Sequence, residues 1–175
     1  MAVPAPVHRV LQDAGLLDDP NLGLNALKAR WVEEAYWIYR HTVTAPAEAA
    51  TQPAWLIFDR LELDAVIWLN GEEVGRHANA HRPAVFNVTG KVTAGENLLV
   101  VQLCHGMHGA ADKPAAGYSV GHIGALTKRH WLRHPQYQSG WDWSARLGNI
   151  GILGDVRLEW HARVRLAQVA VYAVP

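Results

Sequence analysis

Eight short runs of apolar, aromatic and β-branched residues follow one another along this chain, and turn-forming residues separate them. Runs of this length and composition are typical of β-strands. Asn70-Gly71, between two of the runs, favours a two-residue hairpin because both residues adopt positive φ readily. No helical pattern alternates with the runs, so the sequence predicts an all-β fold, an antiparallel β-sandwich. The predicted strands are residues 37–43, 55–58, 65–69, 72–75, 85–88, 98–103, 156–160 and 169–172.

Residues 1–35, before the first predicted strand, favour short helices. Apolar residues recur at helical spacing from Val7 to Ala14, and Gly15 then acts as a stop signal. A second short helix is predicted over 25–31, where Ala, Leu, Lys and Arg favour that conformation. We therefore expect a helical lead-in that precedes the sandwich.

The composition excludes several classes of function. A length of 175 residues suits a single domain, which we take to span 1–175. The 16 Lys and Arg residues balance the 16 Asp and Glu residues, and no basic stripe is visible, so nucleic acid is not an expected partner. No apolar run approaches the roughly 18 residues of a membrane span, and the N-terminus has no secretory signal. We therefore expect a cytoplasmic protein with no membrane association.

No metal ion, cofactor or catalytic centre is expected from the sequence. His105 and His108 have the only metal-like spacing, but glycines surround them and no third ligand follows at a suitable spacing. The acidic residues include no pair in a recognisable acid and nucleophile context. The single cysteine, Cys104, excludes an intrachain disulfide, and its apolar neighbours indicate a buried, inert thiol.

The stretch 105–149 interrupts the strand pattern, and it carries the run Trp141-Asp142-Trp143. It is long, rich in Gly and His and weakly periodic, and such a loop in a compact domain is usually functional or disordered. On an extended backbone the two indoles would point to one side and the carboxylate to the other. An indole can cover the C–H face of a pyranose while a carboxylate accepts from its hydroxyls. The alternative is that both tryptophans are sandwich core and that Asp142 is a turn residue.

Several segments, taken in order, resemble the N-terminal domain of β-mannosidases of glycoside hydrolase family 2. Each is weak alone, and the exo-glucosaminidases of the same family share the general layout. The segments include Leu69-Asn70-Gly71, Arg82-Pro83, Gly95-Glu96-Asn97, Gln136-Tyr137 and Gly140-Trp141-Asp142-Trp143. The sequence departs from the family pattern at Ser144-Ala145, where Gly-Pro is usual, and at Ser139, where an aromatic residue is usual.

The resemblance implies a galactose-binding-like jelly roll, followed in the family by an immunoglobulin-like domain and a (β/α)8 barrel. The two catalytic glutamates belong to that barrel, which alone needs about 250 residues. The resemblance therefore implies a domain excised from a larger multidomain enzyme, with no catalytic residue of its own. We expect much of the loop 105–149 to be mobile in the isolated domain, because its packing partner would be absent.

The resemblance also implies that Asp142 and Trp141 bind a terminal β-mannoside or related sugar over the active site of the barrel. Trp143 is a candidate beside them, because it flanks the same carboxylate. The weaker candidates are Arg133, Tyr137, Asn79 and Arg82. For each of these a structural role ranks higher: a surface charge or an ion pair with Asp142, packing under the loop, and turn or strand roles for the last two. Two other functions stay open, namely a stand-alone carbohydrate-binding module and a structural interface sandwich.

Overall fold

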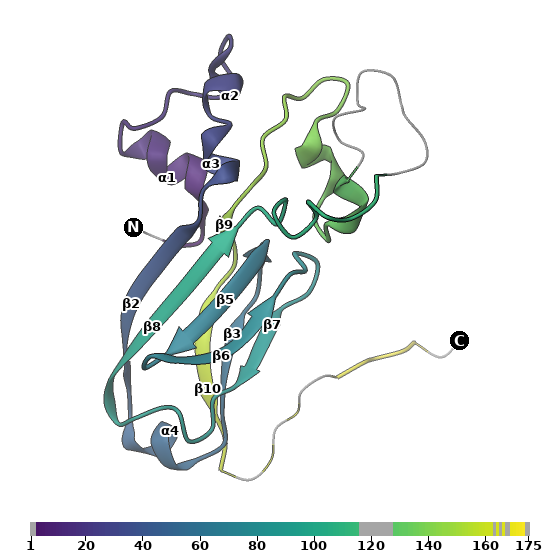
Figure 1. Cartoon of the computed structure of the whole chain (residues 1–175). Helices are drawn as coiled ribbons and strands as arrows, with labels where there is room; N and C mark the ends of the chain where they lie inside the picture. Colours follow the sequence, from purple (N-terminus) through teal and green to yellow (C-terminus); the bar gives the residue numbers. More distant parts are fainter. Residues whose placement is uncertain (1–2, 116–127, 163, 165, 167–168, 174–175) are drawn as a thin grey trace.

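The computed structural model describes residues 3–115, 128–162, 164, 166 and 169–173, and the strands among them form three antiparallel sheets (Figure 1). The four-stranded sheet has the order β2 (Trp37–Ala45), β8 (Gly95–Cys104), β5 (Asp64–Leu69) and β6 (Glu72–His77). A second sheet has the order β10 (Val156–Trp160), β3 (Ala54–Phe58) and β7 (Ala84–Asn87). The third joins β1 (Ala5–Pro6), β9 (Gly151–Ile152) and β4 (Leu61–Glu62).

The hydrophobic core lies between the four-stranded sheet and the β10-β3-β7 sheet. Buried and half-exposed residues alternate along β5 and β8, because successive side chains of a strand point to opposite faces. Ile67 and Leu103 therefore enter the core together, where they join Phe58 and Phe86 of the opposite sheet. The run 55–58 is buried as predicted except at its first residue, which is half-exposed. The prediction of an all-β antiparallel sandwich is confirmed.

The hairpin between β5 and β6 follows the sequence signal. Leu69 pairs with Glu72, and Asn70 and Gly71 form the two-residue turn with φ of 53° and 85°. Both values lie in the left-handed region, which favours Asn and Gly over other residues. The side chain of Asn70 also bonds across to Asn97 and to the backbone N–H of Leu98, so the turn is tied to β8.

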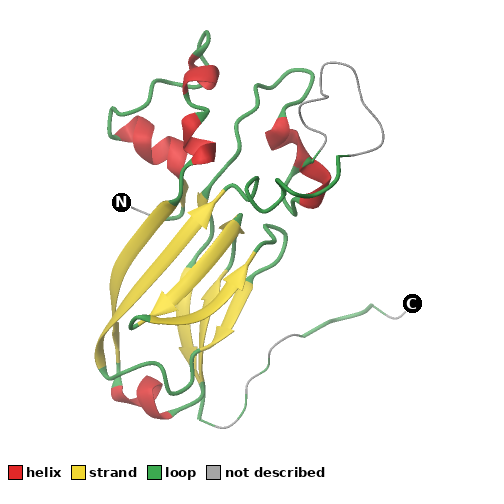
Figure 2. Ribbon diagram, in the orientation of Figure 1, coloured by secondary structure: helices red, strands yellow, loops and turns green. Residues whose placement is uncertain are grey.

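The helices occupy the two ends of the sandwich (Figures 1 and 2). At one end lie α1 (Val7–Asp13), α2 (Asn25–Lys28) and α3 (Trp31–Glu34), together with the loop that carries the 3-10 helices η2 (Arg129–Trp131) and η3 (Gln136–Ser139). The helix α4 (Ala47–Thr51) covers the opposite end. None of these helices is long and apolar enough to cross a membrane, among the residues the structure describes. The first helix is confirmed, with Gly15 beyond its end at φ 70°.

Two predictions of secondary structure are wrong. The single helix expected over 25–31 is two short helices, since the chain turns at 29–30 between α2 and α3. The last strand, expected over 169–172, is absent from the described residues there: Val169, Val171 and Tyr172 lie outside the sheets and are largely exposed. A run with strand-like composition becomes a strand only where a neighbouring strand supplies its hydrogen bonds.

Candidate functional site

The Trp-Asp-Trp run forms a tight turn at the end of the molecule that carries the helices α1 to α3. The backbone groups of Trp141 and Ser144 exchange two hydrogen bonds of 3.3 Å, so Asp142 and Trp143 form the tip. The expectation of an extended backbone is therefore wrong, because a two-residue turn abolishes strand alternation. The two indoles still meet, edge to face, with ring centroids 6.1 Å apart.

All three residues of the run are exposed to solvent. Trp141 is 45% exposed and Trp143 is 83% exposed, so the alternative in which both are sandwich core is wrong. Asp142 is exposed as well and occupies a turn position. The arrangement offers two aromatic surfaces and one carboxylate side by side. Such a combination can cover an apolar ligand face and accept hydrogen bonds from ligand hydroxyls.

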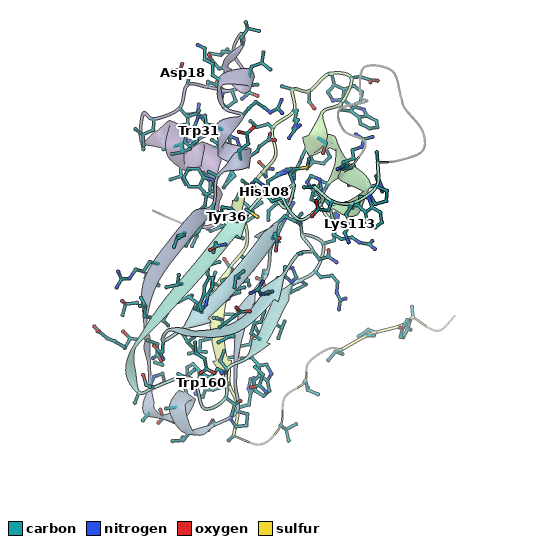
Figure 3. All side chains as sticks on the ribbon, viewed as in Figure 1. Asp18, Trp31, Tyr36, His108, Lys113 and Trp160 are labelled. Atoms are coloured by element: carbon teal, nitrogen blue, oxygen red, sulfur yellow. The ribbon has the colours of Figure 1, made fainter. Side chains whose placement is uncertain are left out.

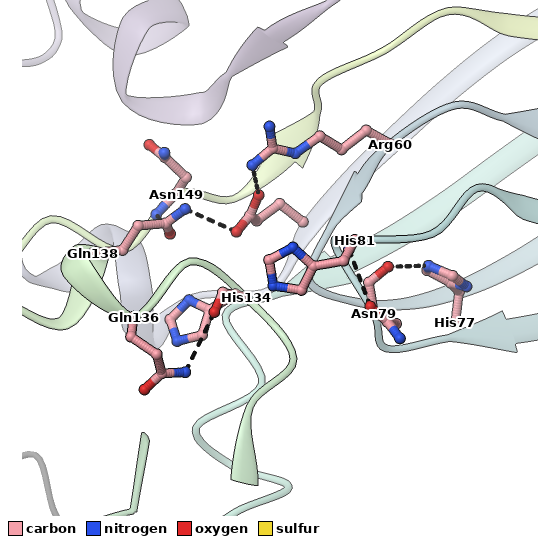
Figure 4. A network of polar contacts seen from close by, with 9 residues as sticks. Arg60, His77, Asn79, His81, His134, Gln136, Gln138 and Asn149 are labelled. Atoms are coloured by element: carbon pink, nitrogen blue, oxygen red, sulfur yellow. Dashed lines mark hydrogen bonds and ion pairs between the residues drawn. The ribbon is translucent and has the colours of Figure 1, made fainter. Parts of the chain in front are cut away.

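A buried carboxylate holds the loop on the N-terminal side of the turn. Glu62, in β4, is 0% exposed, and Gln138 of η3 donates to its Oε1 over 2.9 Å. Arg60 donates to Oε2 over 2.9 Å, so two side chains converge on one carboxylate (Figure 4). The Gln138 Oε1 accepts from the backbone N–H of Asn149 over 3.0 Å, which ties the two stems of the loop together. A buried carboxyl group of this kind is tolerated because its oxygens are hydrogen-bonded.

A second buried carboxylate holds the loop on the C-terminal side of the turn. Glu33, in α3, is 3% exposed, and its Oε2 accepts from Nε and Nη2 of Arg146 over 2.9 and 2.6 Å. Its Oε1 accepts from the backbone N–H of Gly148 over 2.9 Å. Burial alone raises the pKa of Glu33, but the bond from Gly148 and the Arg146 guanidinium outweigh it and hold the pKa below its usual value. The carboxylate is therefore ionised at neutral pH.

Three buried histidines lie close to Glu33. His8, His105 and His134 are each at most 4% exposed, and the rings of His105 and His134 meet edge to face at 5.3 Å. Burial lowers the pKa of all three, that of His105 to about 4, so the rings are neutral at pH 7. The ring nitrogens of His8 and His105 have no hydrogen-bond partner among the described residues.

These anchors bear on the expected mobility of the loop. Residues 128–149 form buried hydrogen bonds to α3 and β4. Because such contacts oppose local opening, the packing of this part favours order over the expected mobility. The remaining residues of the loop divide between 105–115, which the structure describes, and 116–127, which lie outside the described residues.

The weaker candidates belong to the neighbouring backbone. Asn79 and Arg133 form a parallel bridge, in which the N–H of Ala80 donates to the Arg133 carbonyl over 2.8 Å. The Asn79 Oδ1 accepts from the N–H of His81, and Arg82 donates its own N–H to the Asn79 carbonyl over 3.3 Å. Asn79 and Arg82 therefore close a turn, in agreement with the structural role expected for them.

Arg133 and Tyr137 are exposed side chains on the same loop as the turn. Tyr137 is 59% exposed, so packing under the loop does not describe it. Arg133 and Asp142, which were suggested as an ion pair, form none in the described part of the chain. Arg133 instead lines a cavity of about 200 Å³ with Asp64, Lys113 and Trp131.

The two histidines with metal-like spacing point to different neighbours. His105 is buried against His134, whereas His108 stacks on Tyr36 with ring centroids 5.5 Å apart (Figure 3). Within the described ranges, no group of three or more His, Cys, Asp or Glu side chains could hold a metal ion. His105 therefore packs in the interior, whereas His108 is exposed and contacts Tyr36 and the Glu34 carbonyl.

The residues that hold the turn in place were not predicted from the sequence. Glu33 and Arg146 are 113 positions apart, and Glu62 and Gln138 are 76 positions apart. The available signal was an acidic residue between two leucines, Leu61-Glu62-Leu63, where a strand pattern predicts burial. A buried carboxylate requires a hydrogen-bonding partner, but the sequence alone does not indicate which residue supplies it.

Comparison with known proteins agrees with this architecture. Residues 1–154 match the family model described as the glycosyl hydrolase 2 galactose-binding domain-like family. The β-mannosidase B of Emericella nidulans is 35% identical over 162 residues, which cover 90% of this chain and 19% of the relative. The crystal structure of a β-D-mannosidase from Dictyoglomus thermophilum superposes with a TM-score of 0.85 at 34% identity, over 95% of this chain and 21% of that one.

A more distant structure supports the fold alone. An exo-β-D-glucosaminidase aligns with a TM-score of 0.64 at 19% identity, over 90% of this chain and 16% of that one. This chain spans about a fifth of the length of the curated relatives it matches. The fold, the order of the matching segments and the family model agree with one another. The chain belongs to the glycosyl hydrolase 2 galactose-binding domain-like family.

Proposed function

We propose that this chain is the non-catalytic sugar-binding domain of a β-mannosidase-like retaining exo-glycosidase. In this proposal the turn Trp141-Asp142-Trp143 completes the terminal-sugar subsite of a separate barrel domain of the same polypeptide, beyond an immunoglobulin-like domain. The catalytic acid and nucleophile reside in that barrel, and the enzyme works in the cytoplasm without a metal ion or cofactor. The similarity to β-mannosidases over 90% or more of the chain supports the substrate class.

The observation that carries the proposal is the exposed turn on a fixed stem. Asp142 presents its side-chain carboxylate at the tip, and charge-assisted hydrogen bonds from sugar hydroxyls to a carboxylate are strong and directional. The exposed indoles of Trp141 and Trp143 supply the apolar surface that a pyranose ring requires. An exo-enzyme holds the non-reducing sugar by hydroxyls far from the cleaved bond, and such contacts position the reacting bond. Arg133 and Tyr137 lie close by along the loop and are secondary candidates for sugar contact.

The decisive experiment replaces Asp142 in the full-length enzyme. We expect Asp142→Ala to lower kcat/KM for a p-nitrophenyl β-mannoside by about 30-fold or more, because the loss of a desolvated charged partner costs about 2 kcal/mol or more. Asp18→Ala is the matched control, since it removes an exposed carboxylate of the helical lead-in. Wild-type kinetics in Asp142→Ala, with the control also unchanged, would refute the proposal.

A stand-alone carbohydrate-binding module is the second candidate, and the exposure of both indoles favours it. The 175-residue chain would then bind mannosides without a barrel. Calorimetric titration of this chain with methyl β-mannoside distinguishes the two functions. Binding well below millimolar concentration supports the module, whereas weak or absent binding supports a shared subsite. If Asp142→Ala is also silent in the full-length enzyme, a structural interface sandwich becomes the better description.

A further inference from the structure

We infer that Glu33 and Glu62 are positioning residues for the Trp-Asp-Trp turn, and that with Arg146 and Gln138 they form a two-point clamp that fixes its orientation. We call these four residues the clamp. The structural role of the clamp is independent of the proposed function, and only its expected effect on catalysis rests on that function. It assigns a role in ligand recognition to α3 and β4, which contribute no residue to the turn.

The turn has little packing of its own to hold it. Its tip residue Trp143 is 83% exposed, and Trp141 and Asp142 are also exposed. Among the described residues, the backbone hydrogen bonds within the turn are the two of 3.3 Å between Trp141 and Ser144. These bonds define the shape of the turn but not its direction. The direction must therefore come from the stems that enter and leave it.

Each stem ends in a buried charged contact. Gln138 lies three positions before Trp141 and bonds to Glu62, and Arg146 lies two positions after Ser144 and bonds to Glu33. The two carboxylates come from different elements, β4 and α3, and both are at most 3% exposed. Two separate attachment points fix orientation, whereas one would leave a hinge. The Gln138 side chain also accepts from the N–H of Asn149, so the stems are tied to each other as well.

A gain in folding stability does not explain why the clamp uses buried carboxylates. Burying two carboxylates carries a desolvation penalty, and apolar residues of the same volume often stabilise a protein as well or better. A fixed geometry is a better reason, because a binding group that is held in place before the ligand arrives loses less entropy on binding. The Arg146 fork donates two hydrogen bonds to one carboxylate oxygen, which restricts rotation about the contact. The clamp is therefore suited to orient the turn.

Hydrogen–deuterium exchange of the full-length protein tests the clamp directly. We expect Glu33→Gln and Glu62→Gln to speed amide exchange in the peptide that spans residues 139–146 by about tenfold or more, since a hydrogen bond to a charged group contributes that much. Peptides from β5 and β8 should exchange as in the wild type. Glu73→Gln is the control, because Glu73 is exposed and, within the described part of the chain, forms its ion pair with Arg76 in the β5–β6 hairpin.

The outcomes separate the clamp from the proposed function. Faster exchange in the turn together with a raised KM for a β-mannoside supports both. Faster exchange with unchanged kinetics supports the clamp and overturns the proposed function. Unchanged exchange in the turn overturns the clamp whatever the kinetics show. If the glutamate variants lose strand protection, Arg146→Gln replaces them, because this side chain is 22% exposed, and Arg146→Lys should restore part of the protection.

Discussion

The imidazole of His105 lies so close to the Cα of Gly148 that a β-carbon at position 148 would stand 2.2 Å from Nε2. His105 has no room to withdraw, because it is 1% exposed and its ring meets the ring of His134. The N–H of the same glycine donates to Glu33. The absence of a side chain at position 148 is therefore what allows the loop to reach the buried carboxylate.

Gly148→Ala should destabilise the domain through this contact. The added methyl group forces His105 or the loop to move, and overpacking of a buried site costs about 1–3 kcal/mol. Urea unfolding measures the free-energy difference. Gly109→Ala is the matched control, because the nearest atoms to its β-carbon are 3.5 and 3.7 Å away and its backbone is not left-handed. Equal stability of the two variants would contradict the close approach seen at position 148.

The buried histidines predict a loss of stability in mild acid. Burial lowers the pKa of His105 to about 4, with Glu33 opposing the shift and His134, Arg146 and His8 adding to it. The folded protein then binds fewer protons than the unfolded chain between pH 6.5 and about 4, so stability falls as the pH falls through this window. The lowered pKa of Glu33 acts in the same direction at the acidic end.

We expect the unfolding temperature to fall by about 5 °C or more from pH 7 to pH 4.5, since 1 kcal/mol corresponds to about 2–4 °C in a domain of this size. Scanning calorimetry at a series of pH values measures the slope. His105→Gln should flatten it because the titrating ring is removed, whereas His41→Gln, at an exposed position, should leave it unchanged. An unaltered slope in His105→Gln would refute the assignment.

Trp143 should matter for binding and not for folding. Its side chain is 83% exposed, so Trp143→Ala removes little buried area and should change the unfolding free energy by less than about 0.5 kcal/mol. Trp37→Ala provides the contrast, because Trp37 packs on the core and donates its Nε1–H to the Val32 carbonyl over 3.0 Å. That variant should lose about 2 kcal/mol or more in the same chemical denaturation. A large loss in Trp143→Ala would show that the indole is packed.

Cys104 should be inert in the native protein. The residue is 4% exposed, and burial raises the pKa of its thiol, with a hydrogen bond from the backbone of Gly106 opposing and Asp64 reinforcing the shift. The thiolate is the reactive form, so alkylation at pH 7.5 should be negligible without denaturant and complete in urea. Mass spectrometry after iodoacetamide treatment measures the fraction that reacts. Rapid labelling of the folded protein would contradict the buried position.

The sequence predicted the parts of the fold that depend on local pattern. The strands β5 and β8 and the turn at Asn70-Gly71 were predictable, because alternation and positive φ are properties of neighbouring residues. The two-residue strands β1, β4 and β9 were missed, since two residues carry no periodicity. The short helix α4 was missed for a similar reason.

The candidate site divides in the same way. Trp141, Asp142 and Trp143 were found because their residue types and order are distinctive. Their turn geometry was not predicted, because it depends on a bond between the backbones of Trp141 and Ser144 that reverses the chain. The contacts of Glu33 and Glu62 were out of reach, since they join segments that only the folded topology brings together.

The Trp-Asp-Trp segment therefore does not carry all the residues that orient it. A graft of residues 139–145 onto another sandwich would not include Glu62 and Glu33, whose carboxylates hold the two stems. The grafted segment would then lose its fixed orientation. A truncation that removed residues up to 35 would spare every strand of the two sheets that enclose the core, yet it would delete Glu33. In an engineered or naturally shuffled protein, the turn therefore keeps its orientation only if the helical lead-in is transferred together with the sandwich.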